Sequence, residues 1–306
     1  MKGRFAPSPS GRMHLGNVYS AVLSWLSAKS QGGEWVLRIE DLDRQRCRRE
    51  YAEILEDDLL WLGLKWDEGG SAGGPDGPYF QSERSDIYCK ELDKLRQKNL
   101  LYPCYCTRAD IMASSAPHSS DGQVIYGGHC RNLSEAQRIE LEKDRKPAIR
   151  LMVEDVEISF ADGHYGQQTF NLAHDCGDFI LQRADGNFAY QLAVVADDAL
   201  MGVTEVVRGC DLLPSTPQQI CLYRLLGYNV PHFSHIPLLL SSDGRRLSKR
   251  DNGTDMGYLR MMYKPEELLG LIAFYSGILA KPAAISLSEL ATEFSWDKVG
   301  LQNVEV

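Results

Sequence analysis

The sequence predicts an α/β protein built on a doubly wound parallel sheet that is split by an insertion and followed by a small helical region. Strand-like and helix-like segments alternate from the N-terminus and again after Asp178, which is typical of a parallel sheet. Between them, clustered cysteines and segments of alternating polarity indicate an inserted subdomain of antiparallel strands. The first half of the sheet domain, the insertion, the second half and the helical tail are expected at residues 1–100, 101–176, 177–255 and 256–306.

The N-terminal half begins with a short apolar strand that includes Phe5, followed by a loop rich in proline, serine and glycine. A helix is predicted over residues 17–30, because apolar side chains recur there at helical spacing and two glycines follow. The segment WVLRIEDLD, residues 35–43, predicts a second strand. A second amphipathic helix is predicted over residues 51–62 and ends at a glycine.

The insertion contains two segments typical of antiparallel strands, IRLMV and VEISF, with a tight turn after the second. From Asp178 the parallel α/β pattern is expected to resume with DFILQR. A further helix is predicted to start at Thr216 as the N-cap, with Pro217 at the first helical position and Gln219 completing a capping box. Residues 253–296 are expected to be mostly helical.

Composition and charge restrict the function classes. The 306 residues carry a net charge of −9, from 42 acidic and 33 basic residues, which argues against indiscriminate binding to nucleic acid. Local basic patches remain compatible with that charge. Two runs are candidates, although each could simply be a solvated face: Arg44–Glu50 and Arg245–Arg250. The sequence has no run of about 18 apolar residues and no signal peptide, so we expect no membrane association and a cytoplasmic location.

Two loops hold residues typical of phosphate binding. The stretch RFAPSPSGRMHLGN precedes a predicted helix N-terminus, where free backbone N–H groups attract anions. His14 lies in it beside Gly16, which lets a ligand approach the backbone closely. Far along the chain, LLLSSDGRRLSKRDNG places Lys249 in a second loop after an apolar strand. Each loop alone could be an ordinary surface loop, but together they could close on a triphosphate from two sides.

Four blocks of the sequence, FAPSPSGRMHLGN, RIEDLDRQR, YQLAVVADDALMGVTEVVRG and RRLSKRD, resemble the signature blocks of the class I glutamyl-tRNA synthetase family. HLGN matches that family's HIGH motif and RLSKR its KMSKS motif, with Asn17 in place of the second histidine. The blocks occur in order over nearly the whole chain. The resemblance implies a split Rossmann-like catalytic core of the class I synthetases.

The sequence departs from that family in one large respect. After the KMSKS-like loop there is room only for a short helical tail, whereas glutamyl-tRNA synthetases continue into a helical anticodon-binding region. A compact core with cysteines in the insertion resembles the glutamyl-queuosine tRNA(Asp) synthetases. That family activates glutamate without tRNA and attaches it to queuosine at the wobble position of tRNA(Asp).

The resemblance implies a glutamate-binding site. Arginine binds a carboxylate with two parallel hydrogen bonds, and Arg4 and Arg208 fall on positions that hold glutamate. Glu40 suits the ammonium group. As an alternative, Arg208 could pair with a nearby acid such as Glu205 or Asp211. As another alternative, Tyr190 could pack in the core. The residues on glutamate-binding positions are Arg4, Phe5, Ala6, Pro7, Ser8, Glu40, Tyr190 and Arg208.

The resemblance also implies an ATP site. Activation requires positioning and neutralisation of phosphate charge more than covalent chemistry by the protein. His14 and the loop amides would hold the phosphates, Lys249 would stabilise the departing pyrophosphate, and Mg²⁺ would arrive with ATP without a dedicated protein site. His14 and Lys249 are the expected catalytic residues. The implied ATP-binding residues are Gly11, His14, Gly16, Asn17, Ser248 and Lys249.

The clustered cysteines raise the question of a metal. In the resembling family, three cysteines and one tyrosine hold a structural zinc, and three thiolates with one harder ligand can form a closed tetrahedral site. From residue chemistry alone, His129 or His118 would be the fourth ligand, because imidazole ligands are far commoner. Three reduced thiols without metal are the alternative. The residues that match the family's zinc ligands are Cys104, Cys106, Tyr126 and Cys130.

The sequence therefore predicts a monomeric ligase that converts L-glutamate and ATP to glutamyl-adenylate without tRNA. It would then transfer glutamate to queuosine in tRNA(Asp), and would contain one structural Zn²⁺ per chain. The nearest alternative is a shortened glutamyl-tRNA synthetase that charges tRNA(Glu). A second alternative, from a different class, is a non-catalytic paralogue that only binds tRNA or glutamate.

Overall fold

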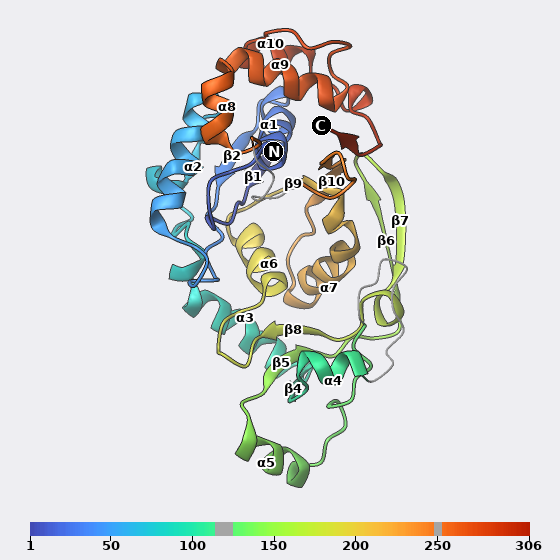
Figure 1. The fold of residues 1–306 in the computed structure, drawn as a ribbon. Coiled ribbons are helices and arrows are strands. Elements are labelled where there is room, and N and C mark those ends of the chain that lie inside the picture. The colour runs from blue at the N-terminus through green and yellow to red at the C-terminus, as the bar shows by residue number, and fades with distance from the viewer. Residues whose placement is uncertain (114–124, 248–252) are drawn as a thin grey trace.

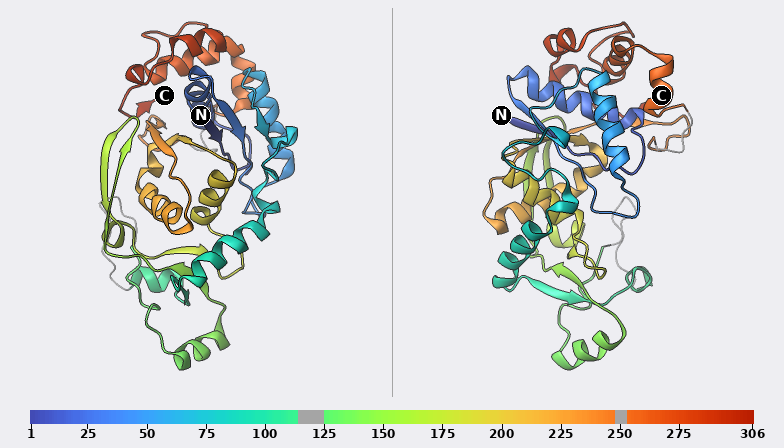
Figure 2. Two further views of the ribbon diagram at one scale, coloured as in Figure 1. Left: turned by 180° about the vertical axis from the view of Figure 1, so that it is seen from behind. Right: turned by 90° about the vertical axis from the view of Figure 1, so that its left-hand side faces the viewer.

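The computed structural model describes residues 1–113, 125–247 and 253–306. Figure 1 shows the parallel strands between a helical cap at one end of the molecule and the insertion at the other. Figure 2 shows the same arrangement from behind, with the C-terminal helices at one end and the green insertion at the other. The N-terminal half contains β1 (Lys2–Phe5), α1 (Leu15–Ser30), β2 (Glu34–Leu37), α2 (Arg49–Trp61), β3 (Glu68–Gly69) and α3 (Ser85–Gln97).

The second half and the tail follow the insertion in the chain. They contain α6 (Tyr190–Leu200), β9 (Glu205–Gly209), α7 (Thr216–Leu226), β10 (His232–Ile236), β11 (Leu239–Leu240), α8 (Met256–Met262), α9 (Pro265–Ser276), α10 (Leu287–Glu293) and β12 (Val304–Glu305). Short 3-10 turns lie at Gly70–Ala72, Gln81–Glu83, Cys210–Ser215 and Trp296–Lys298, and a π turn at Leu172–Cys176.

The parallel strands lie in the order β3–β2–β1–β9–β10. Strand β1 pairs with β2, β2 with β3 and β9 with β10, all in parallel. Strand β9 lies on the other side of β1, where the Thr204 N–H donates to the Lys2 carbonyl at 2.9 Å. The strand order therefore reverses direction at β1, as in a doubly wound sheet. Such sheets bind ligands at the carboxyl ends of the strands beside this point.

Both faces of the sheet are covered, because alternate residues of each strand point to opposite faces. Trp35 and Leu37 of β2 pack in the apolar cluster that contains α1 and the C-terminal helices α9 and α10. Val36 packs in the other cluster, with α3, α6 and α7. Helix α1 begins two residues earlier than the sequence predicted, because His14 is its N-cap.

The insertion contains an antiparallel sheet of three strands in the order β4–β5–β8, and an antiparallel hairpin of β6 and β7. The expectation that DFILQR resumes the parallel sheet is wrong, because β8 pairs with β5. The apolar residues of β8 could pack against a core in the parallel sheet or in the antiparallel one. The pattern of polar and apolar residues alone therefore does not show which strand β8 pairs with. The elements are β4 (Leu101–Cys104), α4 (Arg108–Ala113), α5 (Glu135–Asp144), β5 (Ala148–Leu151), β6 (Glu157–Asp162), β7 (Gly166–Asn171) and β8 (Phe179–Gln182).

The N-terminus of α7 also differs from the sequence prediction. The N-cap is Ser215 rather than Thr216, which is the first helical residue. The Thr216 hydroxyl is fully buried and accepts a hydrogen bond from Arg208 at 2.8 Å. A residue type that usually caps helices therefore serves here to hold a buried arginine.

The C-terminal segment is helical as expected, but it ends in a strand. Strand β12 pairs in parallel with β11, and β11 precedes the second signature loop. The tip of the β6–β7 hairpin reaches the same segment, where the His164 imidazole lies 2.8 Å from the Gly300 carbonyl oxygen. Among the described residues, no helix is both long enough and apolar enough to span a bilayer.

Candidate active site

A cavity of 460 Å³ lies at the carboxyl ends of β1 and β9. It brings together every nominated glutamate- and ATP-binding residue that the structure describes. Ser248 and Lys249 lie outside the described residues, although Leu247 lines the cavity. The nominated residues that line it are Arg4, Phe5, Ala6, Pro7, Ser8, Gly11, His14, Gly16, Asn17, Glu40, Tyr190 and Arg208.

The loop after β1 continues the pairing of β1 with β2 beyond the sheet. The Arg38 N–H donates to the Phe5 carbonyl at 3.0 Å, and the Glu40 N–H donates to the Pro7 carbonyl at 2.9 Å. These bonds satisfy backbone groups that a loop would otherwise leave unpaired. They also fix Glu40 beside the loop that carries Ser8.

The HLGN stretch forms the N-terminus of α1. The Asn17 amide oxygen accepts a hydrogen bond from the His14 N–H at 3.2 Å, so Asn17 satisfies one backbone donor at the start of the helix. Gly16 lies against the His14 ring, and a Cβ at Gly16 would lie 3.1 Å from ring atom Cε1. Glycine at this position therefore leaves room for the imidazole, which a larger residue would force to shift by a few tenths of an ångström.

The two signature loops meet through their backbones. The Leu15 N–H donates to the Thr254 carbonyl at 2.8 Å, and the Met256 N–H donates to the Met13 carbonyl at 2.8 Å. Leu247, just before residues 248–252, lines the cavity. The segment after the KMSKS-like loop is therefore hydrogen-bonded to the loop that contains His14, and the segment before it borders the same cavity.

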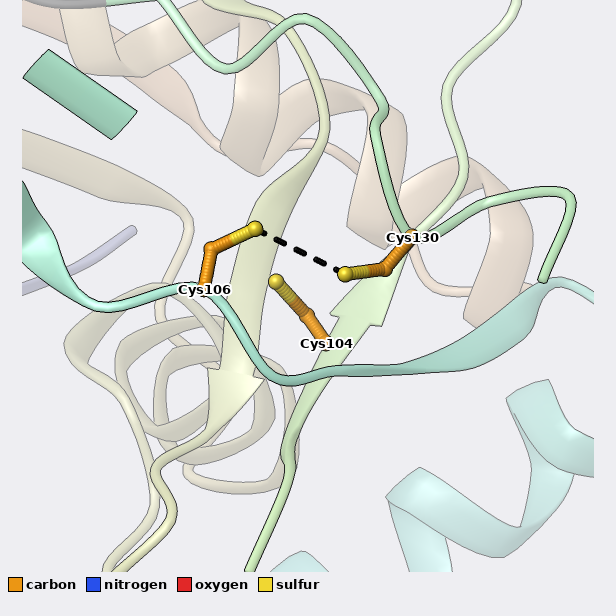
Figure 3. A group of neighbouring side chains, drawn as sticks. All are labelled: Cys104, Cys106 and Cys130. Atoms are coloured by element: carbon orange, nitrogen blue, oxygen red, sulfur yellow. Dashed lines mark hydrogen bonds between the residues drawn. The ribbon is translucent and has the colours of Figure 1, made fainter. Parts of the chain in front are cut away.

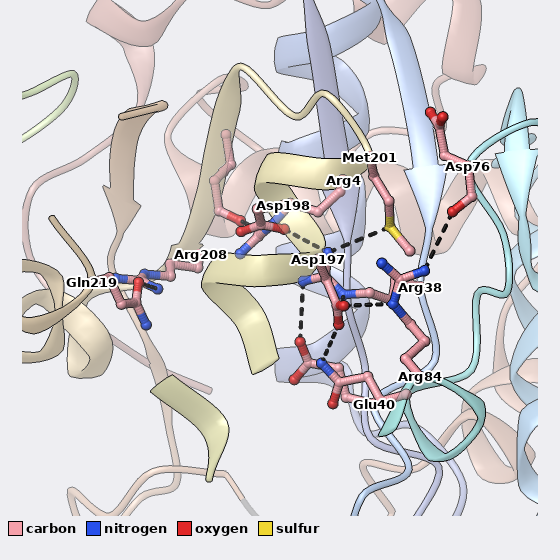
Figure 4. A network of polar contacts seen from close by, with 12 residues as sticks. Arg4, Arg38, Glu40, Asp76, Arg84, Asp197, Asp198, Met201, Arg208 and Gln219 are labelled. Carbon is pink, nitrogen blue, oxygen red and sulfur yellow. Dashed lines mark hydrogen bonds and ion pairs between the residues drawn. The ribbon is translucent and has the colours of Figure 1, made fainter. Parts of the chain in front are cut away.

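A cluster of buried arginines and carboxylates lies behind the cavity (Figure 4). Arg38 Nη1 lies 2.6 Å from Asp198 Oδ1, and its Nη2 lies 3.3 Å from Glu40 Oε1. Arg4 Nε lies 3.5 Å from the same Asp198 oxygen. The cluster has three cations and three anions, so these charges balance one another. Its members are Arg4, Arg38, Arg84, Glu40, Asp197 and Asp198.

Arg208 differs from these arginines, because its direct hydrogen-bond partners are all uncharged. Its Nε lies 3.0 Å from His235 Nε2, its Nη1 donates to Gln219 Oε1 at 2.7 Å, and its Nη2 donates to Thr216 Oγ1 and the Leu212 carbonyl. Figure 4 shows Arg208 and Gln219 apart from the arginine–carboxylate cluster. Burial lowers the pKa of Arg208.

The alternative in which Arg208 pairs with a nearby acid does not hold. Glu205 accepts a hydrogen bond from Ser27 at 2.8 Å, and Asp211 pairs with Arg246. Within residues 1–113, 125–247 and 253–306, Arg208 forms no ion pair. A buried cation without a direct counter-ion is costly, and an anionic ligand in the cavity would supply that counter-ion.

The pKa of Glu40 is shifted toward neutral pH. Burial raises the pKa of Glu40 to about 6, although the charges of Arg38 and Arg4 oppose the increase. Glu40 is therefore a carboxylate at pH 7 and loses its charge as the pH falls below 6. The pKa of Tyr190, which also lines the cavity, is raised by burial.

A second cavity of 480 Å³ adjoins the first and was not predicted from the sequence. The two share Ser8, Ser10, Glu40 and Tyr190 in their walls. Charged and polar side chains lie beside apolar ones in the second cavity, which suits a ligand with both a ring and hydrogen-bonding groups. Its further lining includes Leu42, Asp43, Arg46, Gln81, Ile180, Arg183, Asn187 and Phe188.

The three nominated cysteines come together in the insertion (Figure 3), and the fourth nominated ligand, Tyr126, lies beside them. The sulfur atoms of Cys104, Cys106 and Cys130 lie within 4.8 Å of one another, and those of Cys106 and Cys130 are 3.6 Å apart. The Tyr126 hydroxyl oxygen lies 3.4 Å from Cys104 Sγ and 3.7 Å from Cys106 Sγ. The four groups therefore form a compact cluster that could hold a metal ion.

These distances can be compared with a zinc site. Zn–S bonds of about 2.3 Å and Zn–O bonds of about 2.0 Å in a tetrahedron place ligand atoms about 3.5–3.8 Å apart, close to the separations observed. Arg150 lies 3.8 Å from the centre of the Tyr126 ring, in a cation–π contact that helps to hold the ring in place. Of the histidine alternatives, His129 is exposed and outside the cysteine group, and His118 lies outside the described residues.

The first basic run is largely paired with nearby residues. Arg46 pairs with Asp43 at 2.6 Å, and Arg49 pairs with Glu83 at 3.2 Å. Arg44 donates to the Ser82 carbonyl. The run is nevertheless exposed, and Arg46 lines the second cavity. A role in binding RNA stays a prediction.

Sequence reasoning missed several residues that shape the site. The adjacent acids Asp197 and Asp198 lie within the apolar run AVVADDALM, and two buried acids on one helix require buried partners, so this signal was available. Arg38, their partner, directly follows the apolar strand β2 and could have been recognised in the same way. Asp162 and His235 gave no comparable signal, because they meet only in the folded chain.

Known proteins resemble this chain along its length. A family model described as tRNA synthetases class I (E and Q), catalytic domain, matches residues 1–297. A protein named Glutamyl-Q tRNA(Asp) synthetase from Symbiobacterium thermophilum is 49% identical and covers 99% of this chain and 95% of its own length. A protein of the same name from Nitratidesulfovibrio vulgaris is 48% identical, and the match covers 91% of this chain and 87% of that protein. The crystal structure of a glutamate tRNA ligase from Elizabethkingia meningosepticum matches with a TM-score of 0.84 at 32% identity, over 100% of this chain and 66% of that one.

Proposed function

Since the chain belongs to the family of class I tRNA synthetases (E and Q), we propose that it activates L-glutamate with ATP and transfers it to queuosine in tRNA(Asp). It is a ligase, and its similarity to two glutamyl-Q tRNA(Asp) synthetases extends over nearly the full length of all three proteins. We further propose that it acts in the cytoplasm as a monomer.

The charge of the main cavity carries the assignment of glutamate. Bound glutamate has two carboxylates and one ammonium group, and hence a net charge of −1. The arginine–carboxylate cluster is balanced, whereas Arg208 lacks a direct counter-ion among the described residues. Among the charges at the cavity this leaves one positive charge, which matches the ligand. The nearby buried anion Asp162 does not line the cavity and contacts Arg208 only through His235. Arg208 would bind one carboxylate, and Glu40 would receive the ammonium group beside Arg4 and Tyr190.

In the first step, a carboxylate oxygen of glutamate attacks the α-phosphorus of ATP. A new phosphorus–oxygen bond forms, the bond from the α-phosphorus to the bridging oxygen breaks, and pyrophosphate leaves. His14 and the loop amides around Gly11 and Gly16 would hold phosphate oxygens at the N-terminus of α1. Lys249 would stabilise the charge that develops on pyrophosphate. Magnesium would supply further charge neutralisation when bound with ATP.

In the second step, a nucleophilic atom of the modified base attacks the activated carbonyl carbon and AMP leaves. The second cavity would receive this base, because it opens onto the first at Glu40 and Tyr190. Phe188 offers an aromatic face, and Asn187, Gln81 and Arg183 offer hydrogen bonds at its walls. RNA recognition commonly uses such unstacked loop bases.

The acceptor can be tested with tRNA that lacks its terminal adenosine. We expect tRNA(Asp) trimmed in this way to accept as much labelled glutamate as the intact molecule, because the base and not the terminal ribose is modified. Loss of labelling on trimming would instead show that the protein charges the 3′ end, as the similarity to glutamate tRNA ligase structures would allow.

The raised pKa of Glu40 predicts a pH dependence. Below about pH 6, protonation removes the negative charge that would hold the ammonium group. The KM for glutamate in tRNA-free pyrophosphate exchange is therefore expected to rise by about tenfold for each pH unit below 6. The KM for ATP should change much less over this range. Glu40→Gln should have a high KM for glutamate at all pH values, and a variant that retains the wild-type pH profile would contradict the assignment.

We also propose that the cluster of Cys104, Cys106, Tyr126 and Cys130 binds one structural zinc ion. The ligand spacing supports this, and the metal would link the segment that carries Cys104 and Cys106 to the one that carries Tyr126 and Cys130. Freshly purified protein should contain one zinc per chain. Cys130→Ser should lose most of it and unfold at a temperature several degrees lower. Cys89→Ser, at an exposed cysteine in α3, should keep both properties. Purified protein without metal would contradict the proposal.

A further inference from the structure

A buried chain of three side chains connects the insertion to the main cavity. Asp162 Oδ2 lies 2.5 Å from His235 Nδ1, and His235 Nε2 lies 3.0 Å from Arg208 Nε. Each of the three residues is at most 5% exposed. Asp162 ends β6 in the hairpin of the insertion, His235 lies in β10, and Arg208 lies in β9. The chain therefore crosses from one subdomain to the other.

The position of the imidazole proton follows from the chemistry of the partners. The Nε of arginine always carries a hydrogen and can only donate, so Nε2 of His235 must accept. The proton of the neutral ring is then on Nδ1, where it is donated to Asp162. A protonated imidazole would place an N–H against the N–H of Arg208, so the arrangement requires a neutral His235.

Burial, together with two neighbouring arginines, keeps His235 neutral. Burial is the largest influence and lowers the pKa of His235; the charges of Arg208 and Arg4 lower it further, against the opposing effect of Asp162. Asp162 is held by backbone N–H groups of His164, Tyr165 and His235. Burial acts to raise the pKa of Asp162, but these hydrogen bonds and the bond from the imidazole together lower it. Asp162 is thus a fixed anion on the far side of the ring.

We propose that Asp162 and His235 are positioning residues that orient Arg208 for one carboxylate of the substrate. Asp162 fixes the tautomer and the plane of the ring, and His235 then fixes Nε of the guanidinium. The negative charge of Asp162 acts on Arg208 only through the imidazole, so the arginine is held without being neutralised by a direct ion pair. This inference rests on the proposed function, in which glutamate occupies the main cavity.

The opposite side of the guanidinium is held in a matching way. Nη1 of Arg208 donates to Gln219 Oε1, so the Gln219 amide nitrogen is left to donate to Gln191 Oε1 at 2.8 Å. The Gln191 amide nitrogen then donates to Gln218 Oε1 at 2.7 Å. All of these partners are uncharged. Arg208 is therefore oriented on both sides while its charge remains available to a ligand.

Two substitutions of His235 distinguish a role in orienting Arg208 from a purely structural role. In His235→Gln, the amide oxygen can occupy the place of Nε2 and accept from Arg208. In His235→Asn, the shorter amide can donate to Asp162 but does not reach Arg208. Loss of a hydrogen bond to a charged group should raise the KM for glutamate in pyrophosphate exchange by about tenfold or more in His235→Asn. His235→Gln should remain within about threefold of wild type. The KM for ATP and kcat should change little in both.

Ser27→Ala is the matched control, since it removes a buried hydrogen bond to Glu205 of the same strand β9 without touching Arg208. It should leave the KM for glutamate unchanged. Equal effects of Asn and Gln, or parallel increases in the KM for ATP, would overturn the proposal and leave His235 a structural residue.

If the His235 variants do not fold, Asp162→Asn provides a second test. Oδ1 of Asp162 accepts from the backbone N–H groups of His164 and Tyr165, so the amide oxygen would stay there and the NH2 group would face Nδ1. The ring would then carry its proton on Nε2, against the N–H of Arg208, and the KM for glutamate should rise by about tenfold or more. A KM within about threefold of wild type would overturn the claim that Asp162 acts by fixing the tautomer. Wild-type protein without glutamate-dependent exchange would refute the proposed function itself, before any variant is compared.

Discussion

Replacing Arg208 with alanine should raise the KM for glutamate by a factor on the order of 10² to 10³, because truncating one member of a buried charge pair typically costs 2–5 kcal/mol. The lost binding energy would include the cost of leaving the substrate carboxylate buried without a cation. Arg208→Lys should recover little of it. A lysine cannot replace the planar fork, and it would leave His235 and Gln219 without their donor.

The measurement is tRNA-free pyrophosphate exchange at varied glutamate and ATP concentrations. The KM for ATP should change little, since the residues proposed to hold the phosphates belong to the loop of His14 and not to the strand of Arg208. Arg96→Ala, at an exposed arginine of α3, is the control and should behave as wild type. An Arg208→Ala variant that folds and keeps its KM for glutamate would remove the basis for the charge argument.

Lys249→Ala should abolish most glutamate-dependent pyrophosphate exchange, with a fall in kcat of about 10²–10³ and little change in the KM for glutamate. The expected role is to stabilise charge on the departing pyrophosphate, which develops only in the transition state. Leu247 lines the cavity and Thr254 is hydrogen-bonded to Leu15, so both flanks of the loop lie at the ATP end of the site.

Lys264→Ala is a suitable comparison, because Lys264 is an exposed lysine at the start of α9. It should retain full exchange activity. If Lys249→Ala also retained full activity, the KMSKS-like loop would have no part in the chemistry. The resemblance of this motif would then be structural only.

Local patterns predicted much of the fold, because helices and parallel strands leave clear periodicities. The helix predicted over residues 17–30 extends from Leu15 to Ser30, and the predicted helix over residues 51–62 extends from Arg49 to Trp61. The error at β8 arose because strand polarity does not reveal the pairing partner. The position of Thr216 was misjudged for a related reason, since its hydroxyl meets Arg208 and not the helix backbone.

The residues of the site that lie in sequence motifs could be predicted, whereas contacts between segments far apart in the sequence could not. The motif residues Arg4, His14 and Arg208 line a single cavity, although their roles stay predictions. The contact of Asp162 with His235 joins residues 73 positions apart on different subdomains. No local pattern encodes such a contact. The second cavity was missed similarly, because its walls come from four separate stretches of chain.

The most direct test of the central claim is transfer of labelled glutamate, with ATP, to tRNA from cells that make queuosine and from cells that do not. We expect label only in the queuosine-containing tRNA, in the tRNA(Asp) fraction, because the modified base is the acceptor. Equal labelling of both pools would contradict this and identify a shortened enzyme that charges the terminal adenosine. Absence of label from both pools, together with absence of pyrophosphate exchange, would contradict the assignment as a ligase.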